Sequence, residues 1–430
     1  MSSPPSVPGI PAKRELRWVE RTVDWRLELG ISTLDYDDPE GGSTGVWNVS
    51  EWSETGAEDG PRWGGFFVEW VEITGRVLSA ESSRGRERFD ERIRPGTGRF
   101  EIDNSDGLLN PITGELPNAL RMRPGRAIRL SANAGEGWIP VFTGFADRID
   151  ERYRGAGFDV TTVINASDTG TLMAVDNPPA LETPTPIETT TQRITRILDA
   201  FGWPYRELDT SSVRMRASTL GQSRFEEAQR AADAEGGAFY FDGEGTAIFR
   251  NREWSQFELK EPSDIIGGPL GLPIVDVDVE WTAAIIVNDA QYARIDGEAI
   301  RQENPQSQAL YGTRTRRRFD LQCQDDTDVE YLASRVVERL AYDRLRVNAV
   351  TVHPFTNLEA RRALALAIGD VVTVTVSLRG GLWSYTTEAS IQGIAHRVTA
   401  SDWEVTYQLE DTQSGPPGTA FDAGFTTGFA

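Results

Sequence analysis

A chain of 430 residues is too long for one ordinary hydrophobic core, so several packed domains are expected. The formal charge of −22 argues against tight binding to nucleic-acid phosphates, which requires clustered Lys and Arg, although an acidic surface would let DNA pass without sticking. One cysteine, Cys323, excludes an internal disulfide framework and a cysteine-rich zinc site, and two histidines supply little for transition metals or acid–base chemistry.

The first part of the chain is predicted to be all β. Residues 1–17 are rich in Pro and Ser and indicate a flexible N-terminal arm. Residues 18–170 alternate large apolar and polar side chains in short stretches between Gly, Asn, Asp and Pro turns, which predicts a first β-barrel-like domain. Inside it, residues 35–61 form an acidic, Gly-rich insertion. We interpret this insertion as a solvated loop. A calcium site is a more specific alternative, but the DxDxDG spacing of a calcium-binding loop is missing.

The stretch DNSDG, Asp103 to Gly107, poses the same choice between an ion-binding loop and a turn. A calcium loop would require alternate oxygen ligands and a distal bidentate Glu. Asn, Asp, Ser and Gly are also the commonest turn formers, because their side chains bond the local backbone or tolerate positive φ. The turn is therefore the preferred interpretation.

A Pro/Thr-rich linker, residues 171–190, leads to a small α+β domain, residues 191–260. Its first helix should bury one face, made of Ile194, Ile197, Leu198 and Phe201. The second helix is expected to begin at Ser223, with Glu226 three residues on in the capping-box pattern, and to end at Gly236. A hairpin turning at Asp242 should follow.

The remainder is predicted as two further units and a tail. Residues 261–345 form a β-strand/helix domain, in which we expect the stretches 274–281 and 283–295 to pair as strands. A long helix follows and should turn four residues inward: Leu332, Val336, Val337 and Leu340. Residues 346–411 read as three or four alternating strands of a second β-barrel-like domain, and residues 412–430 as an extended Gly/Thr/Phe-rich tail.

The sequence offers little support for catalysis. His353 and His396 have no neighbouring triad pattern, and no hydrolase, metalloprotease or phosphate-loop motif occurs. The basic cluster GTRTRRRFD, Gly312 to Asp320, could contact DNA phosphates; we favour a strand or loop that pairs with acidic neighbours or a partner subunit. We therefore assign no catalytic, cofactor-binding or metal residues and no cofactor, and leave interface and channel-lining residues unassigned.

The order of these blocks resembles a known family. The stretch from Trp70 to Pro111, the helix and hairpin around AEGGAFYFDGEG, and the ending IGDVVTVTV with IQGIAHRVTASDWEVTYQLE are similar to the hub proteins of phage tail tips. These are the minor tail proteins of siphophages and gene-transfer particles. The resemblance covers most of Trp70 to Glu410, and the acidic insertion 35–61 is its main departure.

The resemblance implies a mainly β, multi-domain α+β fold with two β-barrel-like tube domains at its two ends and small α+β domains between them. It also implies a homotrimer that adapts a six-fold tail tube to a three-fold tip and forms part of the conduit for the tape-measure protein and DNA. The implied partners are the distal tail or tube protein above and a fibre or spike below. The implied location is the distal tip of the virion tail, with only indirect contact to the host envelope.

A second hypothesis is a tip component that binds or degrades host-envelope carbohydrate. Trp47, Trp52 and Trp63, near the acidic insertion, could stack on sugars, although such residues are more often core or interface anchors. The chain runs only about twenty residues past its last predicted strand, so we expect no appended enzyme module. The structural hub is the preferred prediction.

Overall fold

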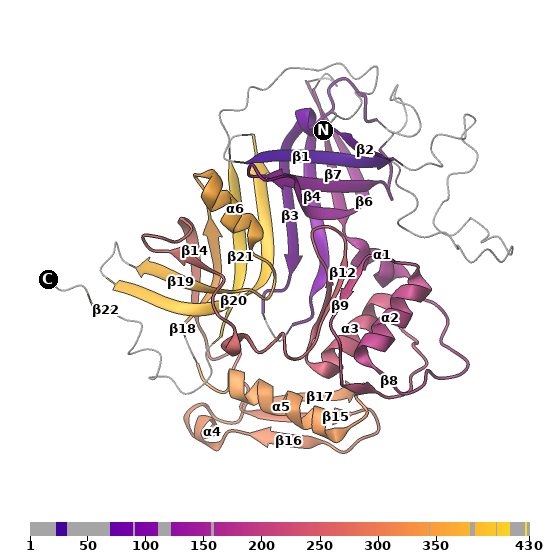
Figure 1. Cartoon of the computed structure of the whole chain (residues 1–430), viewed down its shortest axis with the longest axis vertical. Helices are drawn as coiled ribbons and strands as arrows, with labels where there is room; N and C mark the ends of the chain where they lie inside the picture. The colour runs from indigo at the N-terminus through magenta and orange to yellow at the C-terminus, as the bar shows by residue number, and fades with distance from the viewer. Residues whose placement is uncertain are drawn as a thin grey trace.

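The computed structural model describes residues 23–31, 69–88, 91–110, 122–155, 159–343, 345–378, 383–400, 402–412 and 426–427. Figure 1 shows long strands making up most of the molecule, magenta helices on one flank, a further helix on the opposite side, and a small sheet with orange helices at one end. This mainly β arrangement with six helices in the described ranges confirms the predicted fold class. The N-terminal arm, the insertion 35–61 and the three tryptophans near it lie outside the described residues.

Seven antiparallel strands form the first half of one large sheet, in the order β3-β4-β7-β6-β5-β1-β2. They are β1 (Asp24–Ile31), β2 (Glu69–Glu72), β3 (Val77–Gly85), β4 (Arg94–Asp103), β5 (Ala127–Asn133), β6 (Ile139–Arg154) and β7 (Asp159–Ser167). Successive side chains of a β-strand point to opposite faces of the sheet, and Phe100 and Ile102 of β4 accordingly both point inward and are fully buried. The predicted series of short strands is thus confirmed for the described part of 18–170.

The second half of the sheet comes from later segments. It contains β13 (Asp264–Gly267), β14 (Ile274–Trp281), β18 (Leu345–Val352), β19 (Val371–Leu378), β20 (Trp383–Thr399) and β21 (Trp403–Asp411). The order is β14-β18-β21-β20, and β19 pairs with β20 and β13. Helix α6 (Asn357–Ala365) contacts this half, since the Tyr407 hydroxyl donates to the Ala363 carbonyl at 2.7 Å.

The predicted pairing between residues 274–281 and 283–295 is wrong. Strand β14 pairs instead with β18, placing Ile274 opposite Val352, and the second stretch supplies β15 (Asp289–Arg294) to a separate sheet. The residues between β14 and β15 do not fold the chain back into a tight hairpin. The partner of β14 therefore comes from far along the chain rather than from its neighbour.

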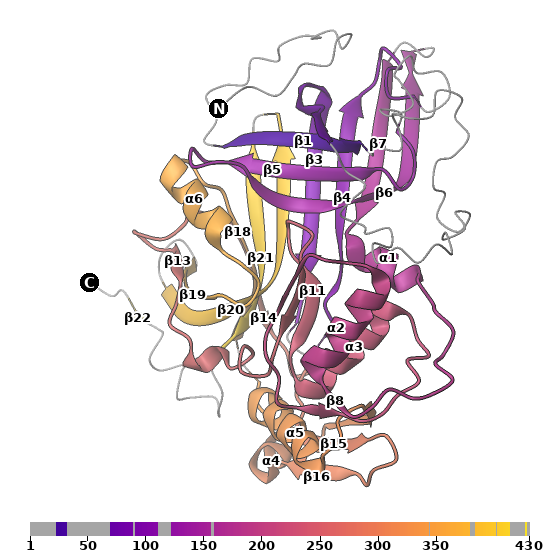
Figure 2. The ribbon, with the colours of Figure 1, turned by 45° about the vertical axis from the view of Figure 1, so that its right-hand side comes forward.

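The small α+β region contains α1 (Thr169–Val175), α2 (Thr190–Phe201), α3 (Arg224–Glu235), β8 (Glu188–Thr189), β9 (Arg206–Leu208), β10 (Arg214–Met215), β11 (Ala238–Phe241) and β12 (Ala247–Arg250). Figures 1 and 2 both show α2 and α3 side by side. The four predicted apolar residues of α2 are buried, and Gly202 and Gly236 end α2 and α3 at φ near 80°.

The small sheet has the order β16-β15-β17, with β16 (Ile300–Glu303) and β17 (Thr315–Leu321) flanking β15. Helix α4 (Pro305–Tyr311) links two of its strands, and α5 (Asp326–Leu340) packs on β15 and β16. Of the residues predicted to face inward on α5, Leu332, Val337 and Leu340 are buried. Val336 is half-buried against the same core.

The hairpin β11–β12 lies between two hydrophobic cores and contributes side chains to both. Ala238 and Tyr240 pack into the core of the large sheet, whereas Phe239 and Phe241 pack into the core formed with the helices. All four side chains of β11 are buried because each face of the strand meets a different core. This hairpin fixes the small α+β region against the large sheet.

Candidate functional site

The two halves of the large sheet meet where β3 pairs with β20. Along this seam, Gly85 lies opposite Gly393, and both strands carry a bulge nearby. Gly85 has φ of +105°, and a Cβ added there would lie 2.4 Å from the Gln392 carbonyl oxygen. The Arg86 Nε atom also donates to Gln392 Oε1 at 2.9 Å. The seam therefore requires glycine at position 85, where the backbone of β20 leaves no room for a Cβ.

A second junction lies at the tip of the β11–β12 hairpin. The Thr143 hydroxyl of β6 donates to the Gly243 carbonyl at 2.9 Å, and Arg84 of β3 donates to the Val141 carbonyl at 2.9 Å. A Cβ on Gly243 would lie 2.4 Å from Arg84 Nη1, so the hairpin tip approaches the large sheet closely. The turn predicted from sequence thus also serves as a docking element.

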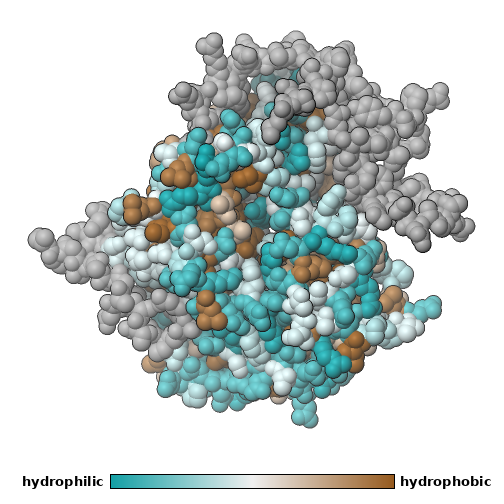
Figure 3. All heavy atoms as spheres, in the orientation of Figure 1, coloured by the Kyte–Doolittle hydropathy of each residue, from teal (hydrophilic) through white to brown (hydrophobic). Residues whose placement is uncertain are grey.

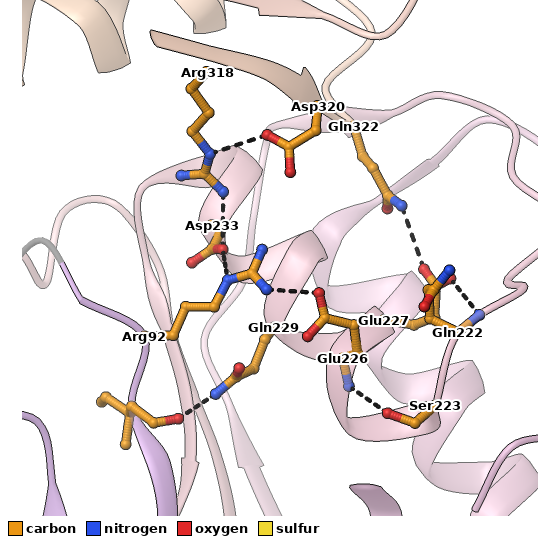
Figure 4. Close-up of polar contacts among 11 residues, drawn as sticks. Arg92, Gln222, Ser223, Glu226, Glu227, Gln229, Asp233, Arg318, Asp320 and Gln322 are labelled. Atoms are coloured by element: carbon orange, nitrogen blue, oxygen red, sulfur yellow. Dashed lines mark hydrogen bonds and ion pairs between the residues drawn. The ribbon is translucent and has the colours of Figure 1, made fainter. Parts of the chain in front are cut away.

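The third junction is a cluster of ion pairs, which we call the Arg92 cluster: Arg92, Glu226, Asp233, Arg318 and Asp320. Figure 4 shows Arg92, from the loop after β3, between two carboxylates of α3. Its guanidinium contacts Asp233 and Glu226, each at 2.6 Å, and Arg318 of β17 reaches the same Asp233 oxygen at 2.9 Å. Burial alone would lower the pKa of Arg92. The contacts with Asp233 and Glu226 outweigh this effect, so the pKa is raised and the guanidinium stays charged.

Hydrogen bonds from two glutamine side chains extend this junction across α3. The Gln229 side chain donates to the Ile93 carbonyl, and Gln322 donates to Glu227 at 3.3 Å, as Figure 4 shows. Ser223 caps α3 by accepting from the Glu226 backbone at 3.3 Å, but the Glu226 side chain turns to Arg92. The predicted start of the helix is confirmed, while the reciprocal half of the capping box is replaced by a contact to the large sheet.

The basic cluster of residues 312–320 lies largely on β17. Arg318 pairs with Asp233 and Asp320, and Arg317 donates to Gln291 Oε1 at 3.1 Å. The preferred interpretation, a strand that pairs with acidic neighbours, is confirmed for Arg318. Contact with DNA remains an untested alternative.

The DNSDG stretch is a turn. The Ser105 backbone N–H donates to Asp103 at 3.0 Å, and Asp106 forms a two-point ion pair with Arg76 at 2.8 Å. Asn104 accepts from the Leu109 backbone N–H at 3.0 Å. The carboxylates therefore fix local geometry, and within the described ranges no group of His, Cys, Asp and Glu is arranged to hold a metal ion.

Each histidine sits in a structural setting. His396 is buried in β20, stacked on Trp403, whose indole N–H donates to His396 Nδ1 at 3.4 Å. Burial, reinforced by the charge of Arg84, lowers the pKa of His396 to about 3, so the ring stays neutral near pH 7. His353 lies beside Phe355 and pairs with Asp402.

Sequence reasoning missed the residues that join the regions. Arg92, Arg84 and Gln229 carry no local motif, and Arg92 lies more than 130 positions from its α3 partners. Helix α6 was also missed, although its Thr356 and Glu359 form a complete capping box that the sequence displays. In the part of the chain that is described, no helix is long and apolar enough to cross a membrane.

Comparisons with known proteins identify the fold. No family model and no curated protein matches the chain. Among solved structures, the 43 kDa tail protein of prophage MuSo2 from Shewanella oneidensis is similar at a TM-score of 0.57 and 12% identity, covering 91% of this chain and 98% of that one. A tail protein from Neisseria meningitidis is similar at 0.55 and 11% identity, covering 83% and 98%. The chain therefore has the fold of phage tail proteins, and the predicted resemblance is confirmed at that level.

Proposed function

We propose that this protein is a structural component of a phage-type tail and that it acts as a trimeric hub at the tail tip. In this role it adapts a six-fold tail tube to a three-fold tip. Its partners are two further copies of itself, the distal tail or tube protein above and a fibre or spike below. The tape-measure protein and DNA pass through its centre.

The observation that carries this proposal is the continuous sheet formed by the two halves of the chain. Pairing of β3 with β20 fixes the two halves of the large sheet against each other. Each protomer therefore carries two β units, one from each half of the sheet. Three such protomers around an axis would present six β units to a six-fold tube. Head-to-tail contacts of this kind form a ring when the rotation closes. The shared fold with two phage tail proteins supports a place in the tail.

An exposed apolar surface supports contacts with another chain. Figure 3 shows hydrophobic residues gathered on the face over and beside α6. We define the α6 face by Ile265, Leu270, Phe355 and Leu358, of which Leu270 is 81% exposed and Leu358 66%. Arg362 holds these segments together, because it donates to the Ile265 and Leu270 carbonyls from one turn after Leu358.

We assign this α6 face to the contact between copies. Two chains that each carry a formal charge of −22 repel each other, so association needs apolar burial to offset the repulsion. Contiguous apolar patches on soluble proteins commonly mark protein contacts. The same overall acidity would keep DNA from adhering to the conduit.

The test is the mass of the purified protein in solution, measured by light scattering, alone and with its neighbouring tail proteins. A trimer, or a monomer that becomes a trimer when the neighbours are added, supports the hub. A chain that stays monomeric in every mixture overturns it. Retention of that monomer on immobilised cell-envelope glycan would favour the carbohydrate-binding alternative.

A further inference from the structure

Two stretches of the large sheet, strand β14 and the far half of β6, have an outer edge with no partner among the described strands. Strand β14 pairs only with β18. Strand β5 pairs with β6 only as far as Phe145, so residues 148–154 of β6 pair with β7 alone. Figure 1 shows β14 and β6 on opposite sides of the sheet. Open edges expose backbone groups that can pair with another chain.

The strands between these two edges fix the direction in which another copy can be added. Their order is β14-β18-β21-β20-β3-β4-β7-β6, eight strands, and every neighbouring pair is antiparallel. Because the number is even, β14 and β6 run in opposite directions. Rotation about a ring axis keeps the direction of each strand along that axis. In a ring, β6 of one copy therefore lies antiparallel to β14 of the next.

The two edges carry opposite charges on the same face of the sheet. Alternate apolar residues of both strands pack on the core of the large sheet: Ile149 of β6, and Val277 and Val279 of β14. Asp276 and Asp278 of β14 and Arg152 and Arg154 of β6 therefore project from the other face, and all four are exposed. Within the described part of the chain, Asp278, Arg152 and Arg154 form no ion pair.

These charges select one register between the two edges. With Asp278 opposite Arg152, antiparallel pairing places Asp276 opposite Arg154, so both carboxylates face a guanidinium. A shift of two residues in one direction puts Asp278 opposite Asp150, and a shift in the other direction carries Asp276 past the end of β6. Directly opposed unlike charges stabilise a strand pair and like charges destabilise it.

We propose that β14 of one copy pairs with residues 148–154 of β6 in the next copy, with Asp276 opposite Arg154 and Asp278 opposite Arg152. This contact rests on the proposed trimer and names the strand edges that close it. The α6 face adjoins the same edge, because the His353 backbone N–H, two residues before Phe355, donates to the Pro273 carbonyl at the start of β14. Ring closure removes both open edges.

Engineered cysteines test this pairing directly. Asp278→Cys combined with Arg152→Cys joins residues of two copies that lie opposite each other, within the range of a disulfide. The matched control combines Asp278→Cys with Asp150→Cys, which moves one partner two positions along the same face. The native Cys323 is buried and does not compete. With mild oxidant, alone and with the neighbouring tail proteins, we expect the first pair to link chains several-fold more completely than the control, as read by electrophoresis without reductant.

Light scattering on the same samples without oxidant separates this proposal from the hub role. A trimer in which the first pair links chains no better than the control overturns the edge pairing and leaves the hub standing. A chain that stays monomeric in every mixture overturns both. Disulfides formed only within one chain also overturn the pairing between copies.

Charge reversal provides a second test. Asp276→Arg with Asp278→Arg, or Arg152→Asp with Arg154→Asp, should raise the concentration at which the trimer half-dissociates by about tenfold or more. All four substitutions together should restore the parent value, because opposite charges again face each other. The four positions are exposed, so the melting temperature should stay nearly unaltered. A protein with all four substitutions that dissociates as readily as either pair would contradict the proposal.

Discussion

Gly85 illustrates, at the scale of a residue, how backbone contact limits the choice of side chain. Its φ of +105° and its approach to Gln392 both exclude a Cβ. Gly107 is a matched control, because it also has positive φ, +69°, but a Cβ there would meet no atom within 4 Å. We expect Gly85→Ala to lower the free energy of unfolding by about 1–3 kcal/mol more than Gly107→Ala, as measured by urea denaturation. Equal losses would show that the seam tolerates a side chain.

His396 makes stability depend on pH. Its pKa is about 3 in the folded protein and near 6.5 in an unfolded chain, so the unfolded state binds more protons between these values. The contribution of His396 is therefore complete above pH 6.5 and is lost as the pH falls toward 3. The His396→Gln variant should be less stable at pH 8 but should lose less further stability between pH 7 and pH 4.5.

The measurement for His396 is the difference in free energy of unfolding between the two proteins at each pH. Asp168 gives stability the opposite dependence on pH. Burial raises the pKa of Asp168 to about 7, so its contribution to the free energy of unfolding declines as the pH rises from about 4 to 7. Since Asp168 is present in both proteins, its effect cancels in the difference. A difference that does not change with pH would rule out the proposed role of His396.

At the scale of secondary structure, local signals predicted the elements whose causes are local. Helices α2 and α3 begin at capping side chains and end at glycines, so both appear in the sequence. The partner of β14 could not be predicted in this way, because β18 follows it by more than 60 residues. The contacts of Arg92 were hidden for the same reason. Pairings between distant segments depend on the assembled core rather than on a local pattern.

The Arg92 cluster also belongs to this scale, because it joins α3, β17 and the loop after β3. We expect Arg92→Ala to lower the free energy of unfolding by about 1–2 kcal/mol and to increase hydrogen exchange in α3. Arg148→Ala is the control, since Arg148 is exposed and contacts Asp150 within its own strand. A double-mutant cycle with Asp233→Asn isolates the coupling. No coupling between the two residues would show that the cluster does not hold the regions together.

For the whole molecule, the α6 face links the structure of one chain to its proposed assembly. Leu270→Glu and Leu358→Glu add charge to exposed positions, so the fold should be unaltered and the melting temperature should change by no more than a degree or two. Association should weaken strongly, because the new charges must be desolvated at the contact and add to the repulsion between acidic chains. Light scattering should show monomers at concentrations where the parent protein forms the proposed trimer. Phe319→Glu is the matched control, since Phe319 is 52% exposed on β17, outside the α6 face. If that control dissociates the trimer and the two α6-face variants do not, the contact between copies lies on the small sheet instead.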